Sequence, residues 1–367
     1  MKAKYKIFRI AALLLAAVLF AGCAGSQSGN SENDSRIINP SKNISNRGEL
    51  YLDNEDRLNF MDYESMNKAV ICSKPNCPHT DPETCSAFGM GSRQVLYGNY
   101  IYFIKSETVY EGDKLTQNMS ICRANTDGSE RKTIVTEKGF HEGASSVNAL
   151  VAGDELYFCA SKDEFDQYGT TGFNEIYLFK FNMKEERLEK ITEICKGYHG
   201  GVWIYGFWKG KIYFNYCAFD HELSDEEQAA LDKSKIYTCQ TYNIESGELE
   251  EWEQPTSAVY AGKGYFVYEK ESGVSVIDES GKETYFEDFP YSSTFEIFDG
   301  KIFSPYGKKW GDIDTGEIHD LNVSDTRDSI RDYFDGSFIV NTYALSDEGQ
   351  ILGQEYKKIS QKDLLGS

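Results

Sequence analysis

A turn glycine followed by a short run of alternating apolar residues recurs along most of this chain. The copy at 153–158 reads Gly-Asp-Glu-Leu-Tyr-Phe, and related copies begin at Gly98, Gly210, Gly262, Gly300 and Gly336. Successive glycines lie 55, 57, 52, 38 and 36 residues apart, by subtraction of these numbers. A β-unit that repeats about every 40 to 50 residues is typical of propellers and related arrays.

The composition agrees with a protein built mainly from strands. The 367 residues include 25 Tyr and 22 Phe, which favour the pleated, half-buried surfaces of sheets. They also include 32 Gly but 7 Pro, a ratio that favours many tight turns over Pro-rich linkers. No long segment keeps apolar residues at helical spacing. These features predict an all-β chain.

The segment 95–135 shows the repeat in full. Two strands flank Gly98, a third is expected at 118–125, an Asp-Gly turn stands at 127–128, and a fourth strand follows at 132–135. Four antiparallel strands in this order form one blade of a β-propeller. Counting 49–72 as the first unit, we predict seven four-stranded antiparallel blades within residues 48–367, with six or eight as alternatives because the first unit is short.

The first 22 residues have the pattern of a secretory signal. Basic residues at 2, 4, 6 and 9 precede an apolar run at 10–20, which is too short for a stable membrane span. The run ends in Phe-Ala-Gly-Cys at 20–23, which resembles the lipobox of bacterial lipoproteins. The resemblance implies that Cys23 is lipidated after cleavage and holds the protein on the outer face of the cell membrane. The alternative is an ordinary signal peptide with an incidental Cys.

Residues 23–47 are expected to be a flexible tether that carries the lipidated Cys23. This stretch is rich in Ser, Asn and Gly, and it has too few apolar side chains to offset the entropy of ordering it. The whole chain has a formal net charge of −21, and removing residues 1–22 takes away four positive charges, which leaves −25 (−21 minus 4). A net charge this negative repels nucleic acid and anionic lipid, which are therefore disfavoured as partners. We therefore expect membrane contact through the lipid anchor only.

A constrained loop at 72–85 gathers three Cys and one His. Cys72, Cys77, His79 and Cys85 follow the spacing C-x4-C-x-H-x5-C, and three of the seven prolines stand among them. Thiolate and imidazole ligands suit tetrahedral Zn²⁺, and four of them would close a structural site. In an exported protein two of the three Cys could instead form a disulfide, and the loop could also be a functional ligand-binding site. Structural zinc is the prediction that we carry forward.

Five further cysteines share no spacing and lie in or beside predicted strands. They are Cys122, Cys159, Cys195, Cys217 and Cys239. We expect them to act as small buried hydrophobic residues rather than as a disulfide framework. This would leave the thiols of the 72–85 loop free to bind a metal.

An aromatic segment at 198–208 is the candidate ligand-binding surface. It contains Tyr198, His199, Trp203, Tyr205 and Trp208. Strand alternation predicts that Trp203, Tyr205 and Phe207 share one face, with Ile204 and Trp208 off it. These rings could stack against a sugar or a peptide at the mouth of the propeller. The alternative is packing between blades, where large aromatic side chains fill the space between sheets.

The repeated hairpins, the strand at 121–125 with its Asn-x-Asp-Gly-Ser turn at 125–129, and the Cys/His loop together resemble a known family. It is a family of Gram-positive bacterial lipoproteins of unknown function, similar to TolB-like and low-density-lipoprotein-receptor-propeller-like domains. The resemblance implies a propeller architecture but no activity, because the family has no established catalytic residues. The sequence itself holds no G-x-S-x-G, H-E-x-x-H or phosphate-loop motif.

These observations favour a surface-anchored binding or scaffold propeller that recognises a protein, peptide or glycan. No catalytic residue is assigned. Two alternatives stay open: an extracellular enzyme on a propeller scaffold, such as a lyase or glycosidase, and a lipoprotein that handles metal or redox equivalents through the Cys/His loop. We expect no cofactor other than zinc at that loop.

Overall fold

The computed structural model describes most of the chain. It covers residues 35–38, 43–45, 47–111, 114–142, 148–166, 169–231, 236–252, 258–270, 272–290, 295–304, 307–323, 328–345 and 351–366. The predicted signal peptide 1–22 and the predicted lipidation site Cys23 lie outside these residues. None of the helices in the described part is long and apolar enough to cross a membrane.

The strands after residue 42 form consecutive antiparallel meanders, which we number as blades. Blade 1 contains β2 (Asn43–Ser45), β3 (Gly48–Leu52), β4 (Leu58–Asp62) and β5 (Lys68–Val70). Blade 2 contains β6 (Ser92–Tyr97), β7 (Tyr100–Glu111), β8 (Lys114–Asn125) and β9 (Lys132–Lys138). Blade 3 contains β10 (Ala149–Ala152), β11 (Glu155–Asp166), β12 (Gly169–Asn182) and the first part of β13 (Arg187–Trp208).

The remaining strands continue the same arrangement. Blade 4 contains the second part of β13, then β14 (Lys211–Phe219), β15 (Thr238–Asn243) and β16 (Leu249–Glu251). Blade 5 contains β17 (Ala258–Gly262), β18 (Tyr265–Lys270), β19 (Gly273–Asp278) and β20 (Glu283–Glu287). Blade 6 contains β21 (Glu296–Phe298), β22 (Lys301–Ser304), β23 (Lys309–Asp312) and β24 (Ile318–Asp320), and blade 7 contains β25 (Ser329–Phe334), β26 (Ser337–Leu345) and β27 (Ile351–Ser360).

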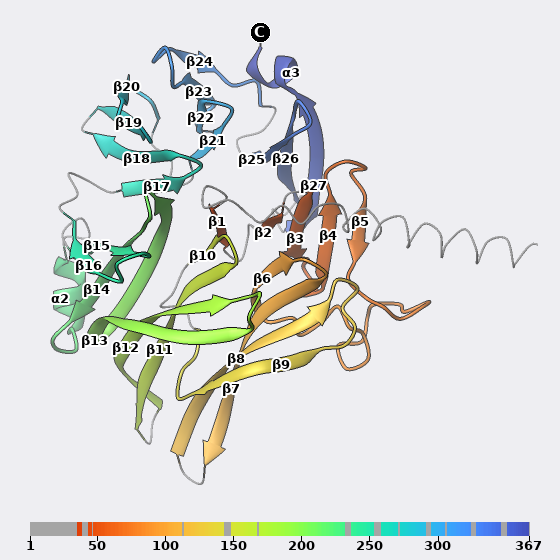
Figure 1. Cartoon of the computed structure of the whole chain (residues 1–367), viewed down its shortest axis with the longest axis vertical. Helices are drawn as coiled ribbons and strands as arrows, with labels where there is room; N and C mark the ends of the chain where they lie inside the picture. Colours follow the sequence, from red (N-terminus) through yellow and green to blue (C-terminus); the bar gives the residue numbers. More distant parts are fainter. Residues whose placement is uncertain are drawn as a thin grey trace, which may run out of the picture.

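Hydrophobic clusters between neighbouring blades join them into a ring. Each cluster holds buried residues from both neighbouring blades. In chain order from the junction of blades 1 and 2, representative pairs that share a cluster are Leu50 and Ile101, Tyr102 and Phe181, Leu178 and Phe214, Tyr213 and Phe266, Phe286 and Ile302, and Phe303 and Phe338. A further cluster, which includes Tyr63 and Ile339, joins blade 7 back to blade 1. Figure 1 shows the coloured meanders following one another round the molecule. The alternating Tyr and Phe residues of the repeat therefore fill the spaces between blades.

The all-β class and the propeller architecture predicted from the sequence are confirmed. The described strands form seven meanders, of which six have the four strands predicted and the last has three, β25 to β27. Blade 1 begins earlier than expected, because β2 adds Asn43–Ser45 to a sheet that we expected to start near residue 48. The sequence did not indicate β2 because its three residues, Asn-Ile-Ser, are too few to show an alternating apolar pattern. Only its antiparallel pairing with β3 identifies it as a strand.

Another part of the expected tether lies inside the ring. Strand β1 (Ser35–Ile38) pairs antiparallel with β10, with Ser35 opposite Ala152 and Ile38 opposite Ala149. It also lies beside β2, β6 and β13. The strands β2, β6, β10 and the second part of β13 are each the first strand of a blade. Figure 1 places β1 in the middle of the molecule among these strands. Strand β1 therefore lies at the centre of the ring.

Strand β13 runs from blade 3 directly into blade 4, and it contains two irregularities. Its register with β14 shifts between Tyr198 and Gly201 and again between Ile204 and Gly206. The second shift reverses the alternation predicted for the end of this strand. Phe207 packs with Ile204 in the cluster between blades 3 and 4, whereas Tyr205 and Trp208 pack in the cluster between blades 4 and 5. The prediction that Phe207 shares a face with Tyr205 is therefore wrong.

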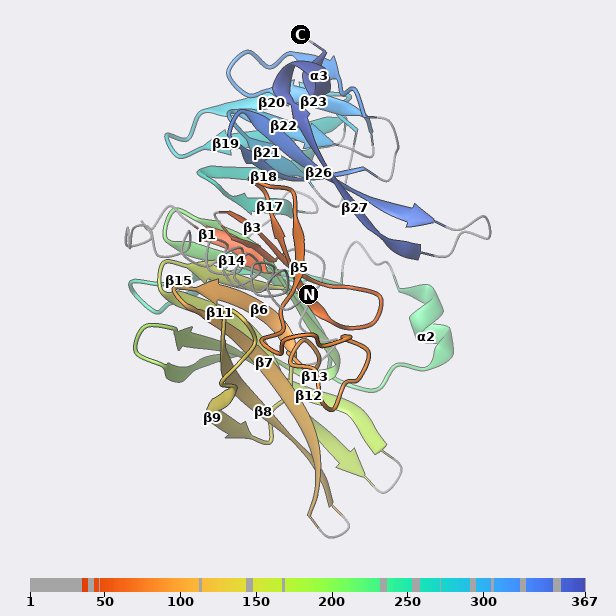
Figure 2. The same ribbon diagram turned by 90° about the vertical axis from the view of Figure 1, so that its right-hand side faces the viewer.

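The two ends of the blades form two different faces of the ring. The turns between first and second strands, such as those at Gly98 and Gly153, lie on one face, which we call the turn face. The connections between second and third strands lie on the other, which we call the hairpin face; they include the β7–β8, β11–β12 and β26–β27 hairpins and helix α2 (Asp225–Ala230) between β14 and β15. Figure 2 shows α2 and the β26–β27 hairpin projecting to the same side.

Candidate metal centre

The loop between β5 and β6 brings the four predicted ligands together. One ligand atom each from Cys72, Cys77, His79 and Cys85 lies within 4.8 Å of all the others. In a tetrahedral zinc site with Zn–S bonds of about 2.3 Å and Zn–N bonds of about 2.0 Å, neighbouring ligand atoms are about 3.5–3.8 Å apart. Contraction of about 1 Å would bring the widest pair to that spacing. The four side chains are therefore positioned to hold a metal ion.

The loop backbone is fixed by its own hydrogen bonds. The N–H of Cys77 donates to the carbonyl of Lys74 at 3.3 Å, and the N–H of Cys85 donates to the carbonyl of Asp81 at 2.9 Å. The Asp81 carboxylate in turn accepts the N–H of Glu83 at 2.9 Å. These bonds close two short turns, one that ends at Cys77 and one that ends at Cys85. The sequence C-x4-C-x-H-x5-C therefore folds back on itself without a strand or helix.

His79 is aimed at Cys85 by an unusual backbone conformation. Its φ is 55°, in the left-handed region that few non-glycine residues adopt. Its Nδ1 lies 3.4 Å from the Sγ of Cys85, close to the separation expected of two ligands of one ion. Its carbonyl accepts a hydrogen bond from Nη1 of Arg57 at 3.2 Å, which ties the loop to the β3–β4 turn.

The thiols differ in how readily they lose a proton. Burial raises the pKa of Cys72, but hydrogen bonds from Ser86 and from the backbone N–H of Lys74 outweigh it and lower that pKa to about 6. Burial raises the pKa of Cys85 to about 11, although the N–H of Ala87 donates to its Sγ at 3.4 Å and opposes the shift. Metal binding requires thiolates.

Two arginines lie next to the cluster. Arg131 donates through Nη1 to the carbonyl of Phe88 at 2.7 Å and through Nη2 to the carbonyl of Ser86. Burial lowers the pKa of Arg131, and the negative charge that Cys85 and Cys72 carry when ionised opposes that shift. Three thiolates and Zn²⁺ would carry a net charge of −1, which this cation would offset. Neither Arg131 nor Arg57 carries a sequence signal for this role, because only the tertiary fold brings them to the loop.

The described cysteines form no disulfide bond. Cys72, Cys77 and Cys85 are free thiols, and so are the five others. The prediction that those five are buried holds for Cys122, Cys159, Cys195 and Cys217, whereas Cys239 is half-buried. Burial raises the pKa of all five, so they are unreactive thiols.

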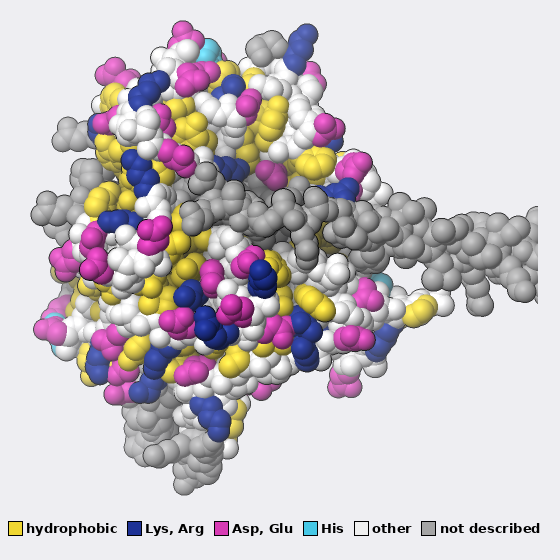
Figure 3. All heavy atoms as spheres, viewed as in Figure 1, with side chains coloured by type: hydrophobic (Ala, Val, Ile, Leu, Met, Phe, Trp, Pro, Cys, Tyr) yellow, Lys and Arg dark blue, Asp and Glu magenta, His cyan; other side chains and the backbone are white. Residues whose placement is uncertain are grey.

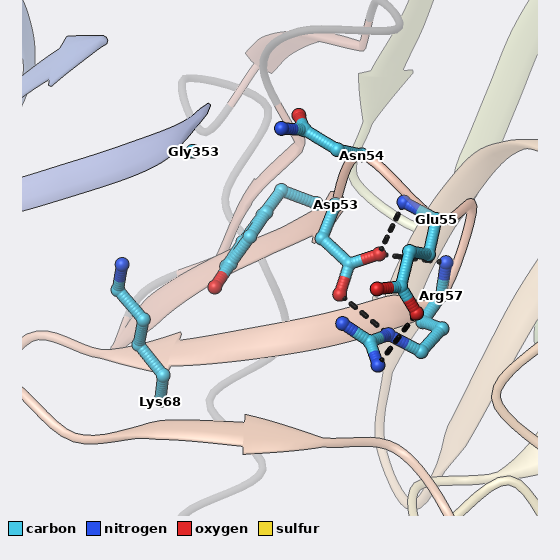
Figure 4. A pocket seen from close by; sticks show the side chains of 7 residues that line it. Asp53, Asn54, Glu55, Arg57, Lys68 and Gly353 are labelled. Carbon is cyan, nitrogen blue, oxygen red and sulfur yellow. Dashed lines mark hydrogen bonds and ion pairs between the residues drawn. The ribbon is translucent and has the colours of Figure 1, made fainter. Parts of the chain in front are cut away.

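A small polar hollow lies beside the loop, between the β3–β4 turn and β27. It has a volume of about 230 Å³ and is lined by Tyr51, Asp53, Asn54, Glu55, Arg57, Lys68 and Gly353. Figure 4 shows the carboxylate of Asp53 turned toward Arg57, whose Nε donates to it at 2.8 Å. Ligand pockets usually exceed about 300 Å³. The hollow is small, and Asp53 and Arg57 are already paired with each other.

The predicted aromatic surface divides into separate groups. Tyr198 packs edge-on against Phe173 at 5.3 Å, next to the exposed His199, whose φ is 53°. Trp203 packs edge-on against the exposed Tyr237 at 5.2 Å. Tyr205 and Trp208 belong to the cluster between blades 4 and 5. The structure therefore does not join the five predicted residues into one stacking platform, and packing between blades accounts for the last two.

The face seen in Figure 3 carries both signs of charge. Acidic and basic side chains are interspersed over it, and no large area of one sign stands out. Positive and negative side chains therefore alternate on this face, although the whole chain has a net charge of −21. Surface charge does not single out a site here.

Comparisons with known proteins give structural similarity only. No family model and no curated protein sequence matches the chain. The β-propeller domain of the Trilobed protease from Pyrococcus furiosus is similar over 90% of this chain and 97% of its own, with 13% identity and a TM-score of 0.43. TolB from Acinetobacter baumannii is similar over 91% and 66%, with 12% identity and a TM-score of 0.32. An oligogalacturonate lyase in complex with manganese is similar over 88% and 76%, with 9% identity and a TM-score of 0.37.

Proposed function

We propose that this chain is an exported, lipid-anchored propeller that acts as a binding or scaffold module, with a structural Zn²⁺ at the 72–85 loop. The observation that supports a binding role is the placement of the long connections. The β7–β8, β11–β12 and β26–β27 hairpins and α2 all extend from one face of a ring whose blades are packed by buried aromatic side chains. Binding residues on loops that a rigid scaffold positions are a common design.

The zinc proposal is supported by the completeness of the ligand set. Three Sγ atoms and one imidazole nitrogen supply all four positions of a tetrahedral site, which leaves none for substrate. The site also lies at the junction of blades 1 and 2, because the carbonyl of Ala87 accepts the N–H of Leu58 at 2.9 Å while Arg131 holds the carbonyl of Phe88. Bound zinc would therefore hold the loop against both blades.

Metal analysis of the purified mature chain tests the zinc proposal. We expect about one zinc per chain, its loss in Cys77→Ser and Cys85→Ser, and retention in the control Cys239→Ser. The same two variants and chelator-treated protein should show a lower Tm and faster proteolysis between residues 71 and 91. Metal loss without any change in stability would instead favour a metal-handling loop. A mass 2 Da lower than that of the free thiols, with no metal, would show a disulfide and refute the zinc site.

Binding measurements test the module proposal. Immobilised mature chain would be exposed to solubilised bacterial cell-wall glycan and, separately, to a peptide library. The control variant replaces the hairpin-face segment 220–231 by a Gly-Ser linker of equal length. Saturable binding that is weaker in the control supports the proposal. Cleavage of either probe, seen by mass spectrometry, would favour the enzyme alternative, and binding that the replacement leaves unchanged would refute a role for this segment.

Labelling with an alkyne-tagged fatty acid in producing cells tests the anchor. We expect incorporation into the wild-type chain and none into Cys23→Ser. Absence of label from wild type would refute lipidation at this position.

A further inference from the structure

The register of β1 fixes the face on which the N-terminal segment leaves the ring. Ser35 lies opposite Ala152, at the end of β10 that leads into the turn at Gly153, and Ile38 lies opposite Ala149 at the other end. Strand β1 therefore runs from the turn face toward the hairpin face. The next strand, β2, pairs antiparallel with β3, the second strand of blade 1, with Ser45 opposite Gly48, and so returns toward the turn face. The chain therefore enters β1 at the turn-face end of this strand.

We infer that the lipid-anchored protein holds its turn face toward the membrane and presents its hairpin face, with α2 and the long hairpins, to partners away from the membrane. This inference rests on the proposed lipidation of Cys23. It assigns the interaction surface of the proposed binding module to one side of the ring. Strand β1 acts as the fixed point of the tether, because its ladder with β10 holds the segment at the centre of the ring.

The length of the tether excludes the opposite orientation. Ser35 comes 12 positions after Cys23 (35 minus 23), and 12 residues span about 40 Å when fully extended and about 20 Å as a flexible chain. To place the hairpin face on the membrane, the segment would first have to run from the centre of the ring to its outer edge, across the four strands of a blade, which is about 14 Å. It would then have to run along the outer edge from the turn face to the hairpin face, which is about 17 Å for a five-residue strand.

The long hairpins add to that distance. Strand β7 pairs with β6 as far as Ile104 but continues to Glu111, so about seven residues, or roughly 23 Å, project beyond the first strand of blade 2. The path would then total roughly 50 Å, which is longer than the extended tether. The turn face has no comparable projection among the described residues, since its connections are short turns such as those at Gly153 and Gly336.

Energy transfer on vesicles tests the orientation. A dye would be attached through an unnatural amino acid either at Glu245, in the β15–β16 turn, or at Glu226 in α2; both are exposed residues of blade 4. The lipidated full chain is bound to phosphatidylcholine vesicles that contain acceptor-labelled headgroups. Because a blade about 17 Å high separates the two positions, we expect at least about twofold more transfer from Glu245. Equal transfer, or more from Glu226, would overturn the inference.

Two control variants separate the possible failures. Cys23→Ser should not bind the vesicles, and failure of the wild-type chain to bind would refute the anchor rather than the orientation. Replacing residues 35–38 by Gly-Ser-Gly-Ser should leave vesicle binding intact and reduce the difference between the two dye positions, because the segment loses its apolar residues and its support from β10. An undiminished difference in this variant, with the β-sheet spectrum preserved, would show that β1 does not orient the ring.

Discussion

Glu49 of β3 and Arg331 of β25 form an ion pair between the first and last blades, and replacing Arg331 by Met tests how the ring is closed. Nε of Arg331 donates to Oε2 of Glu49 at 3.1 Å, and Nη2 donates to Oε1. The Glu49 side chain is 0% exposed and that of Arg331 is 9% exposed. The hydroxyl of Tyr63 also donates to Glu49 Oε2 at 3.2 Å. Burial raises the pKa of Tyr63, and the charge of Glu49 raises it further, so this hydroxyl stays a donor.

The single replacement leaves the Glu49 carboxylate buried without its cation. Breaking a buried ion pair in this way costs about 3–5 kcal/mol. With an unfolding entropy of about 2.1 cal/mol/K per residue over about 320 residues, this corresponds to a fall in Tm of about 4–7 °C. The double replacement Glu49→Leu with Arg331→Met removes both charges. It should cost only about 1–2 kcal/mol, because apolar pairs replace buried ion pairs at little cost and the loss is then limited to the hydrogen bonds that Tyr63 and Tyr356 make to Glu49.

Calorimetry and urea unfolding of the two single variants and the double variant measure this coupling. The expected coupling free energy is at least about 2 kcal/mol. Lys309→Met is the control, because its pair with Asp320 is 40% and 88% exposed, and exposed pairs contribute under about 1 kcal/mol. Single and double variants with additive losses would refute the idea that burial of this pair governs the closure.

Three further changes test the packing between blades and one surface ion pair. Gly206→Ala should prevent stable folding, because the new Cβ would overlap a carbonyl oxygen of β17 and φ is 148°, whereas Gly353→Ala, with open space around it, should leave the Tm unchanged. Trp208→Ala should lower the free energy of unfolding by about 3–5 kcal/mol, seen by urea unfolding, through loss of the aromatic cluster between blades 4 and 5. A hydrogen bond from Lys270 lowers the pKa of Glu283 to about 2; because this is below the unfolded value, the stabilisation is present above about pH 4.5 and is lost as the pH falls toward 2. Glu283→Gln should therefore cost under about 1 kcal/mol at pH 7, since both side chains of the pair are about 40% exposed, and a difference that stays constant down to pH 2 would contradict the pKa assignment.

Blade 2 shows why much of the fold could be predicted from the sequence. Its strands have the period-two apolar pattern, and its turns carry the Gly98 and Asp127–Gly128 signals, all of which are local. The strands expected at 118–125 and 132–135 lie within β8 and β9. Strands β1 and β2 have no such pattern. They are strands only because they form hydrogen-bonded ladders with β10 and β3, and those ladders cannot be read from their own residues. The periodicity of apolar residues therefore cannot predict a strand that is defined only by its hydrogen bonds to a distant partner.

The aromatic segment of β13 shows a second limit. Period-two alternation depends on an uninterrupted strand, and one extra residue sends every later side chain to the opposite face. The irregularity near Tyr205 does this, so Phe207 and Trp208 exchange the sides predicted for them. Gly206, an isolated glycine inside the strand, is the only local signal of the bulge in this segment. It pairs with Ala261 in the next blade, a contact between residues 55 positions apart (261 minus 206) that the segment alone does not reveal.

The sequence by itself determined the all-β propeller class and the grouping of Cys72, Cys77, His79 and Cys85 in one loop, because periodicity, turn chemistry and residue spacing are properties of short segments. The tertiary structure decided what depends on distant partners: the ion pair between Glu49 and Arg331 that joins the ends of the ring, the arginine beside the Cys/His loop, and the passage of β1 through the centre. These features arise when blades far apart in the chain become neighbours. Each of these features needs two segments that are distant in the sequence, and nothing in either segment indicates which other segment it will contact.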